Sequence, residues 1–170
     1  MISPTIYKPR PSHGWVWLVL ISLALLVLTV GVTIPAWAEM PPGIIVMNLV
    51  IGLGFGLPGL ALAYWFRTMQ YELDDAALTL RCGPVLHYRI PLDEIRNIKR
   101  RNLAITLWSS MRLPGLALFN VLYADVGVVK MCATAAADRI LLIETDKTKY
   151  GLTPADEEGL VAALRARMEG

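Results

Sequence analysis

Two long apolar runs without a charged residue constrain what this chain can fold into more than any other feature. The first covers residues 14–38 and the second covers 40–66, with only Glu39 between them. A helix crosses the roughly 30 Å core of a bilayer with about 20 apolar residues. Each run is therefore long enough to cross once, and we expect spans at about 15–37 and 43–66.

The residues between the runs predict a tight connection, so that residues 14–66 form a transmembrane helical hairpin. The sequence Pro41-Pro42-Gly43 interrupts a helix because proline lacks a backbone N–H group and its ring clashes with the preceding turn. Side chains that favour the headgroup level of a bilayer lie near the span ends: Trp15, Trp17, Trp37, Tyr64 and Trp65.

The distribution of basic residues predicts the orientation. Lys8 and Arg10 precede the first span, the connection has no Lys or Arg, and Arg67 begins a segment with many. The positive-inside rule then places both termini in the cytoplasm, with residues 1–13 as a cytoplasmic N-terminal arm. In an alternative interpretation the first run is a signal peptide cleaved after Ala36-Trp37-Ala38, although its apolar part exceeds the usual length of about 7–15 residues.

Glycines in the second span predict close helix packing. Gly52 and Gly56 have the small-xxx-small spacing that lets helix backbones approach, which makes them a candidate helix-packing face. Their partner is either the chain's own first helix or another membrane protein. Asn48 is expected to form an interhelical hydrogen bond. Neither span contains Asp, Glu, Lys, Arg or His, which argues against a proton or ion pathway.

The chain changes character after the second span. Residues 1–66 carry three charged side chains, whereas residues 67–170 carry 27. The second part is therefore a polar module, in which alternating apolar residues predict short strands. These strands are expected near residues 71–73, 78–82, 86–90, 95–100, 126–133, 139–145 and 150–152, with a hairpin turn at Gly83-Pro84.

The end of the module predicts a helix. Thr153-Pro154 followed by Asp156-Glu157-Glu158 is typical of a helix start, and apolar residues then recur at helical spacing. One helix cannot cover both faces of an open sheet, but it can close one end of a strongly bent one. We therefore expect an α+β membrane protein whose module is a bent antiparallel β-barrel capped by a C-terminal helix.

Residues 67–170 resemble a bacterial pleckstrin-homology (PH) domain of the type that follows two membrane spans. The motifs that carry the resemblance are spread over the module: Tyr71-Glu72-Leu73, Arg89-Ile90-Pro91-Leu92-Asp93-Glu94-Ile95, Arg112-Leu113-Pro114-Gly115, Val126-Gly127-Val128-Val129, Ala133-Thr134, Ile140-Leu141-Leu142-Ile143-Glu144-Thr145 and Tyr150-Gly151-Leu152-Thr153-Pro154-Ala155-Asp156-Glu157-Glu158. The resemblance implies a cytoplasmic PH-like barrel at a membrane, and it implies no substrate.

One apolar segment, residues 103–125, does not fit a minimal barrel and follows a basic run. Basic residues beside apolar ones suit attachment to anionic lipid or to a partner. The candidate contacts are Lys99, Arg100, Arg101 and Arg112, with Trp108 and Phe119 as candidate interfacial anchors. Alternatively, this segment is a strand and a long loop folded over the barrel.

Residues typical of catalysis are sparse. Cys82 and Cys132 are the only cysteines, His13 and His87 are the only histidines, and no zinc-ligand spacing, phosphate loop or nucleophile elbow occurs. We therefore expect no enzyme, no cofactor and no metal. The formal net charge of +2 does not indicate a nucleic-acid partner.

The expected function is that of a non-enzymatic, membrane-anchored PH-like domain at the inner face of the membrane. It would act as a binding or scaffolding module through protein or anionic-lipid contacts. The alternative is an accessory subunit of a larger membrane transport or bioenergetic complex. The expected partners are the lipid bilayer and either a second copy or a larger membrane protein.

Overall fold

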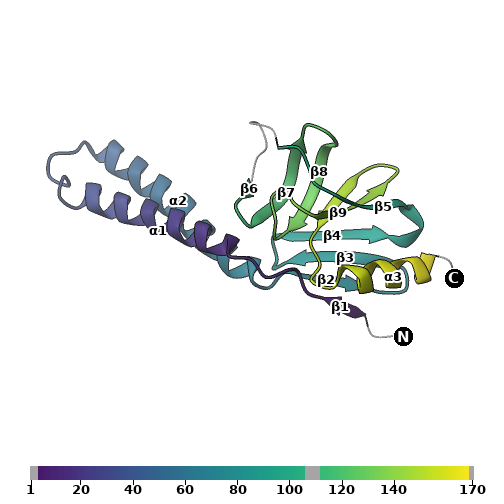
Figure 1. The fold of residues 1–170 in the computed structure, drawn as a ribbon. Coiled ribbons are helices and arrows are strands. Elements are labelled where there is room, and N and C mark those ends of the chain that lie inside the picture. The colour runs from purple at the N-terminus through teal and green to yellow at the C-terminus, as the bar shows by residue number, and fades with distance from the viewer. Residues whose placement is uncertain (1–3, 106–111, 169–170) are drawn as a thin grey trace.

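The structure is a computed structural model, and it describes residues 4–105 and 112–168. The chain forms an apolar helical hairpin that projects from one end of a sheet-rich domain (Figure 1). The hairpin consists of α1 (Gly14–Thr33) and α2 (Pro42–Phe66). Both helices are long and apolar enough to cross a membrane, and only 17% of an 18-residue apolar stretch of each helix is buried. This exposure suits helices that face lipid rather than a protein interior.

Prolines lie at the end of α1 and at the start of α2. The first helix ends at Thr33, before the predicted end near residue 37, because Pro35 follows and has no N–H group to donate to the Gly31 carbonyl. Pro42, which was expected to lie in the turn, is instead the first residue of α2. At that position its missing N–H group has no intrahelical partner to lose.

The glycine face of α2 packs against α1. A Cβ atom at Gly52 would overlap the Thr29 side chain, and one at Gly56 would lie 2.7 Å from Leu26 Cγ. Asn48 Nδ2 donates a hydrogen bond to Thr33 Oγ1 at 3.4 Å, which confirms the predicted interhelical contact. The small residues thus let the two helices of one chain approach closely.

Replacing Gly52 with alanine should destabilise the hairpin by about 1–3 kcal/mol, because the added methyl group overpacks the contact with Thr29. The measurement is thermal unfolding of the full chain in detergent. Gly54→Ala is the matched control, since nothing lies within 4 Å of a Cβ atom there. Equal melting temperatures for the two variants would contradict this packing.

The domain contains two sheets. The first has the strand order β1-β2-β3-β4, with β1 (Thr5–Tyr7), β2 (Gln70–Leu73), β3 (Ala77–Cys82) and β4 (Leu86–Pro91). The second has the order β5-β9-β10-β8-β7-β6, with β5 (Ile95–Arg101), β6 (Arg112–Leu113), β7 (Leu116–Tyr123), β8 (Gly127–Ala133), β9 (Ile140–Thr145) and β10 (Lys149–Leu152). A 3-10 helix, η1 (Leu92–Glu94), connects the sheets.

The predicted strands and terminal helix are confirmed, although the helix begins at Glu157 rather than at Thr153-Pro154. Two details of the predicted barrel are wrong. Within the described ranges the two sheets share no hydrogen-bonded strand pair, so the sheets do not close into a barrel. The second sheet is also not wholly antiparallel. Strand β10 inserts between β8 and β9, pairs antiparallel with β9, and therefore runs parallel to β8.

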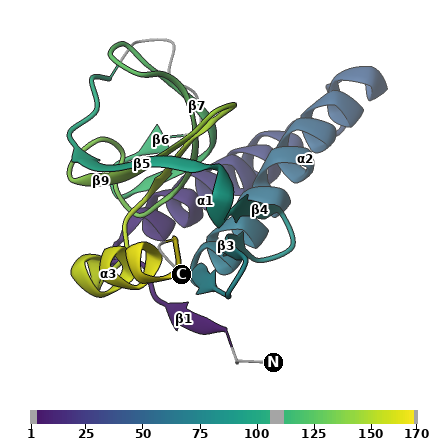
Figure 2. The ribbon, with the colours of Figure 1, turned by 90° about the vertical axis from the view of Figure 1, so that its right-hand side faces the viewer.

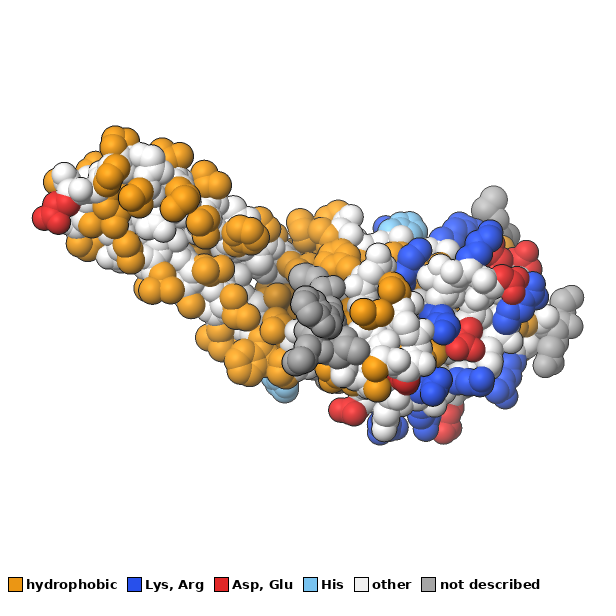
Figure 3. All heavy atoms as spheres, turned by 90° about the horizontal axis from the view of Figure 1, so that it is seen from above, with side chains coloured by type: hydrophobic (Ala, Val, Ile, Leu, Met, Phe, Trp, Pro, Cys, Tyr) orange, Lys and Arg blue, Asp and Glu red, His pale blue; other side chains and the backbone are white. Residues whose placement is uncertain are grey.

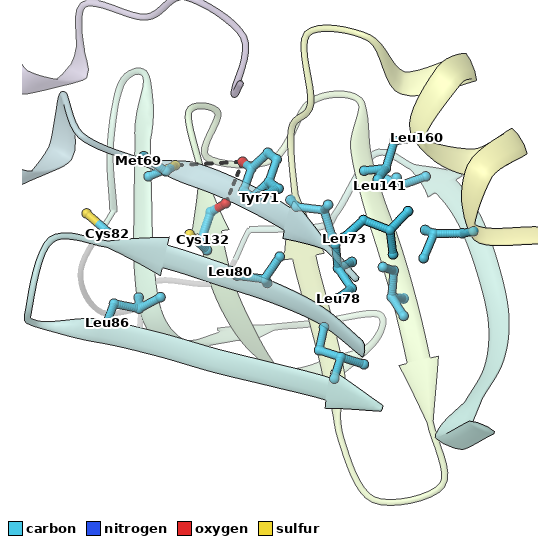
Figure 4. Close-up of a cluster of buried hydrophobic side chains, with 14 of the residues drawn as sticks. Met69, Tyr71, Leu73, Leu78, Leu80, Cys82, Leu86, Cys132, Leu141 and Leu160 are labelled. Carbon is cyan, nitrogen blue, oxygen red and sulfur yellow. Dashed lines mark hydrogen bonds between the residues drawn. The ribbon is translucent and has the colours of Figure 1, made fainter. Parts of the chain in front are cut away.

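Side chains, rather than backbone pairing, hold the two sheets together. A core cluster between them includes Leu80 of β3 and Leu141 of β9 (Figure 4). Helix α3 (Glu157–Met168) covers this cluster with Leu160 and Leu164, neither of which is exposed. Burying a leucine side chain contributes roughly 1.5–3 kcal/mol, so these contacts replace the closing strand pair that a barrel would have.

The described part of residues 103–125 folds onto the domain. Leu103 is buried in a second core cluster with Val121 and Tyr123 of β7, and its N–H group donates to the Ala137 carbonyl at 2.9 Å. These residues match the alternative in which the segment is a strand and a loop packed over the sheets.

The N-terminal arm is an integral part of the domain, which the sequence did not indicate. Strand β1 pairs antiparallel with β2, so that Thr5 lies opposite Leu73. The arm then continues along the segment that precedes α3, where the Ala155 N–H group donates to the Lys8 carbonyl at 2.9 Å. The chain therefore contributes to one sheet both before and after the hairpin.

Thr153 joins the arm to the domain through a buried polar network. Its carbonyl accepts from the Arg10 N–H group at 2.7 Å, and its own N–H group donates to the Tyr71 hydroxyl at 3.2 Å. Its Oγ1 accepts from the Thr134 N–H group at 2.7 Å. The Tyr71 hydroxyl in turn donates to the Cys132 carbonyl at 2.8 Å, so four separate segments meet at one threonine.

Thr153→Val should lower the free energy of unfolding by about 1–3 kcal/mol, because it leaves the buried Thr134 N–H group without its acceptor. Unfolding of the full chain in detergent measures the effect. Thr79→Val is the matched control, since Thr79 is also buried but its hydroxyl forms no hydrogen bond among the described residues. A similar loss in both variants would show that the network contributes nothing specific.

Candidate binding site at the junction of hairpin and domain

The base of the hairpin is part of the domain core. Phe66, the last residue of α2, is buried in the cluster between the sheets. Three further hairpin residues pack against the same cluster: Trp15, Leu18 and Leu62. The hairpin and the domain therefore share one core and form a single packed unit.

Two turns of the domain close on the hairpin, each at a glycine with positive φ. In the β3–β4 turn Gly83 has φ 52° and lies so close to Trp65 that a Cβ atom would be 2.6 Å from the Trp65 Cβ. In the β6–β7 turn Gly115 has φ 79°, accepts a hydrogen bond from Ser12 Oγ, and touches Gly14 at the start of α1. Glycine suits both turns because it alone combines this backbone with such close contact.

A pocket of about 470 Å³ lies at the junction, between the N-terminal arm and the residues that follow α2. Three of the described residues that line it are cationic, namely Lys8, Arg10 and Arg67, and none is acidic. Trp15 and Phe66 contribute apolar surface. We call this the junction pocket.

The cations of the junction pocket form no ion pair among the described residues, although Arg10 also lines a neighbouring pocket with Asp156, Glu157 and Glu158. Among the described residues, no carboxylate lies within 4.0 Å of Lys8, Arg10 or Arg67. The Arg67 guanidinium lies 5.2 Å from the centre of the Trp15 ring, a cation–π contact. Helix α1 begins here without an acidic residue in its first turn, so its positive end adds to the local potential.

Arg10 is oriented by its backbone and by one end of its guanidinium group. Its N–H group donates to the Thr153 carbonyl, and its side-chain NH2 group donates to the Arg139 carbonyl. Its Nε atom is buried and has no hydrogen-bond partner among the described residues. The Arg139 contact fixes one end of the guanidinium group, while Arg10 as a whole lines the junction pocket.

Comparison with known families decides the identity of the domain. A family model described as a bacterial PH domain matches residues 69–168. The chain belongs to the bacterial PH domain family. Comparisons with curated proteins and with solved structures found no match. The PH match covers both sheets except β1 and reaches the end of α3. Lys8, Arg10 and Arg67 therefore lie outside it, on segments that this chain adds to its PH domain.

The basic run predicted to contact lipid lies elsewhere on the PH domain. Arg100 Nε is 2.5 Å from Glu157 Oε1, and Glu157 begins α3, which lies along the side of the domain away from the hairpin (Figures 1 and 2). Arg101 is 3.8 Å from Asp125, and Lys99 on the same strand is exposed. No residue of the run lines the junction pocket.

The other predicted contacts are dispersed. Arg112 is half-buried on β6, next to the turn that touches the hairpin. Phe119 is partly buried and packs against the core cluster between the sheets. Trp108 lies outside the described residues. Gly52 and Gly56 lie against α1.

Both thiols of the PH domain are buried and weakly acidic. Burial raises the pKa of the Cys82 thiol from 9.0 to about 11 and raises that of Cys132 well above 9.0. Among the described residues, no group of three His, Cys, Asp or Glu side chains is placed to hold a metal ion. The described residues therefore offer neither a reactive thiolate nor a metal centre.

Stability should decline at alkaline pH because of these thiols. In the unfolded chain they ionise near pH 9, whereas in the folded chain the Cys82 pKa is about 11. The stability that the protonated thiols contribute to the folded chain is therefore complete below pH 9 and is lost as the pH rises toward 11. Denaturant unfolding of the full chain in detergent between pH 7 and 10 measures the decline. A variant with Cys82→Ala and Cys132→Ala should show a shallower decline, and an unchanged slope would contradict this assignment.

Proposed function

We propose that this chain is a non-enzymatic binding or scaffolding module, which its two-span hairpin holds at the inner face of a bacterial membrane with both termini in the cytoplasm. The packing of the hairpin base into the PH-domain core carries this proposal. Because Trp15, Leu18, Leu62 and Phe66 join that core, the domain has a fixed orientation relative to the spans. Even weak contacts at its surface then act at high local concentration.

The charge distribution supports the orientation. Figure 3 shows hydrophobic side chains over the hairpin, an acidic group at its far tip, and charged side chains over the domain. Glu39 is the one charged residue between the two helices, while Lys8, Arg10 and Arg67 flank them on the side of the domain. Basic residues near the span ends favour the cytoplasmic side.

Family membership supports a role in binding rather than in catalysis. PH domains are generally non-catalytic binding modules. The buried, weakly acidic thiols of Cys82 and Cys132 agree with this role.

The proposal predicts a rigid connection between hairpin and domain, and a distance measurement between the two tests it. Spin labels at Val27 of α1 and Lys147 of the β9–β10 turn, both exposed in the structure, should give a narrow distance distribution for the full chain in lipid nanodiscs. Gly14→Ala should broaden it, because the methyl group would overlap the Gly115 carbonyl. Gly31→Ala in the same helix is the matched control, since nothing lies within 4 Å of its Cβ position.

A broad distribution in the unmodified chain would contradict the proposal, as would a C-terminal reporter fusion located outside the cytoplasm. The full chain is required because β1 precedes the hairpin and an isolated soluble half would lack it. Purification in mild detergent separates the proposal from its alternative. A membrane protein recovered in stoichiometric amounts would favour an accessory subunit of a transport or bioenergetic complex.

A further inference from the structure

We propose that the junction pocket binds the phosphate group of an anionic phospholipid, so that the chain selects lipid headgroups next to its own spans. This inference rests on the proposed function in one respect, namely that the hairpin crosses the membrane. The PH match begins at Met69, so the three cations of the pocket come from the arm and from the end of the hairpin, outside the family domain.

The position of the pocket along the hairpin places it at headgroup depth. Helix α1 has 20 residues, which at a rise of about 1.5 Å per residue gives about 30 Å, the thickness of the hydrocarbon core. The pocket is lined by residues at the span ends and just outside them: residues 8–12 and Trp15 on one side and residues 66–70 on the other, together with Thr134 of the domain. Lipid phosphates occupy this same level.

The chemistry of the lining suits a phosphate diester with its acyl chains nearby. The neutral polar groups are already engaged, since Thr68 Oγ1 donates to the Trp65 carbonyl at 2.8 Å and Gln70 donates to Glu72 at 2.7 Å. The three cations, by contrast, have no carboxylate within 4.0 Å among the described residues. An anion is therefore the ligand that the pocket favours.

Arg10 supplies the most specific contact. Its guanidinium is held at one end by the Arg139 carbonyl, and the residue lines the pocket. Phosphate oxygens accept charge-assisted hydrogen bonds from arginine, and an ordered arginine loses little entropy in making them. Lys8 and Arg67 are more exposed and would contribute charge rather than geometry.

The apolar part of the pocket favours a lipid over a free phosphate ion. Trp15 and Phe66 belong to the lining, and both also contact the core cluster at the hairpin base. Tryptophan is the side chain most typical of the bilayer interface. The volume of about 470 Å³ falls in the usual range for small-molecule sites, which are much larger than an inorganic phosphate.

Native mass spectrometry of the detergent-solubilised full chain tests the inference. The probes are phosphatidylglycerol and phosphatidylcholine, which share acyl chains and differ in net charge. We expect phosphatidylglycerol to bind at least ten-fold more tightly. Because each basic residue near an anionic lipid contributes roughly a five-fold factor in binding, Lys8→Gln combined with Arg67→Gln should reduce binding about 25-fold. Arg10→Gln should remove the preference, whereas Arg10→Lys should restore it only in part.

A variant that loses more positive charge than any of these serves as the control. Replacing Lys99, Arg100 and Arg101 with glutamine removes three positive charges from β5, and no residue of this run lines the pocket. We expect less than a two-fold change in phosphatidylglycerol binding. An equal loss in this variant would overturn the assignment, because it would show a general response to net charge. Melting temperatures confirm that each variant is folded.

Two soluble probes separate a lipid from a free anion. Inorganic phosphate and glycerol 3-phosphate, each at millimolar concentration, should displace less than half of the bound phosphatidylglycerol. Complete displacement would overturn the lipid assignment in favour of a soluble phosphate. Equal affinity for the two lipids would refute the claim that the pocket selects anionic lipid. If the distance distribution between hairpin and domain is narrow at the same time, the scaffolding proposal stays intact. A broad distribution would instead refute the scaffolding proposal.

Discussion

The structure depends on hydrogen bonds that join the segment before α1 and the segment after α2 to the same buried threonine. Before α1, the Arg10 N–H group donates to the Thr153 carbonyl. After α2, Tyr71 on β2 connects to the same threonine through its hydroxyl. Thr153 is fully buried, where a hydrogen bond left unmade costs far more than it does in water. The arm, the hairpin and the sheets are therefore held as one body.

This constraint also determines where positive charge gathers. The helices of the hairpin are antiparallel, so the residues before α1 and after α2 meet at the same end. Lys8, Arg10 and Arg67 thus come to line one pocket. The basic residues of β5 have a different setting, because Arg100 and Arg101 lie beside Glu157 and Asp125. Exposed pairs of this kind contribute little stability, but they do neutralise the local charge.

Much of the fold followed from sequence patterns. The apolar runs predicted both hairpin helices, and the alternation of residues such as Leu78 and Leu80 predicted the strands. The terminal helix was expected to start at Thr153-Pro154, but α3 begins at Glu157, where Asp156 Oδ1 accepts a hydrogen bond from the Gly159 N–H group. The position of β10 and the open barrel were not predictable in this way. Alternation shows which side of a strand is buried, but it does not specify which strand lies next to it. The insertion of β10 beside β8 depends on how the segments pack.

The sequence by itself determined that the chain has an apolar hairpin and a charged PH module. Charge and hydropathy can be read from each segment alone, without knowing what the segment packs against. Only the tertiary structure decided that the arm completes a sheet and that Lys8, Arg10 and Arg67 share a pocket. These residues lie up to 59 positions apart, and in the sequence they indicated only orientation. Their common site arises because hydrogen bonds and core packing at Thr153 and Phe66 bring distant segments together.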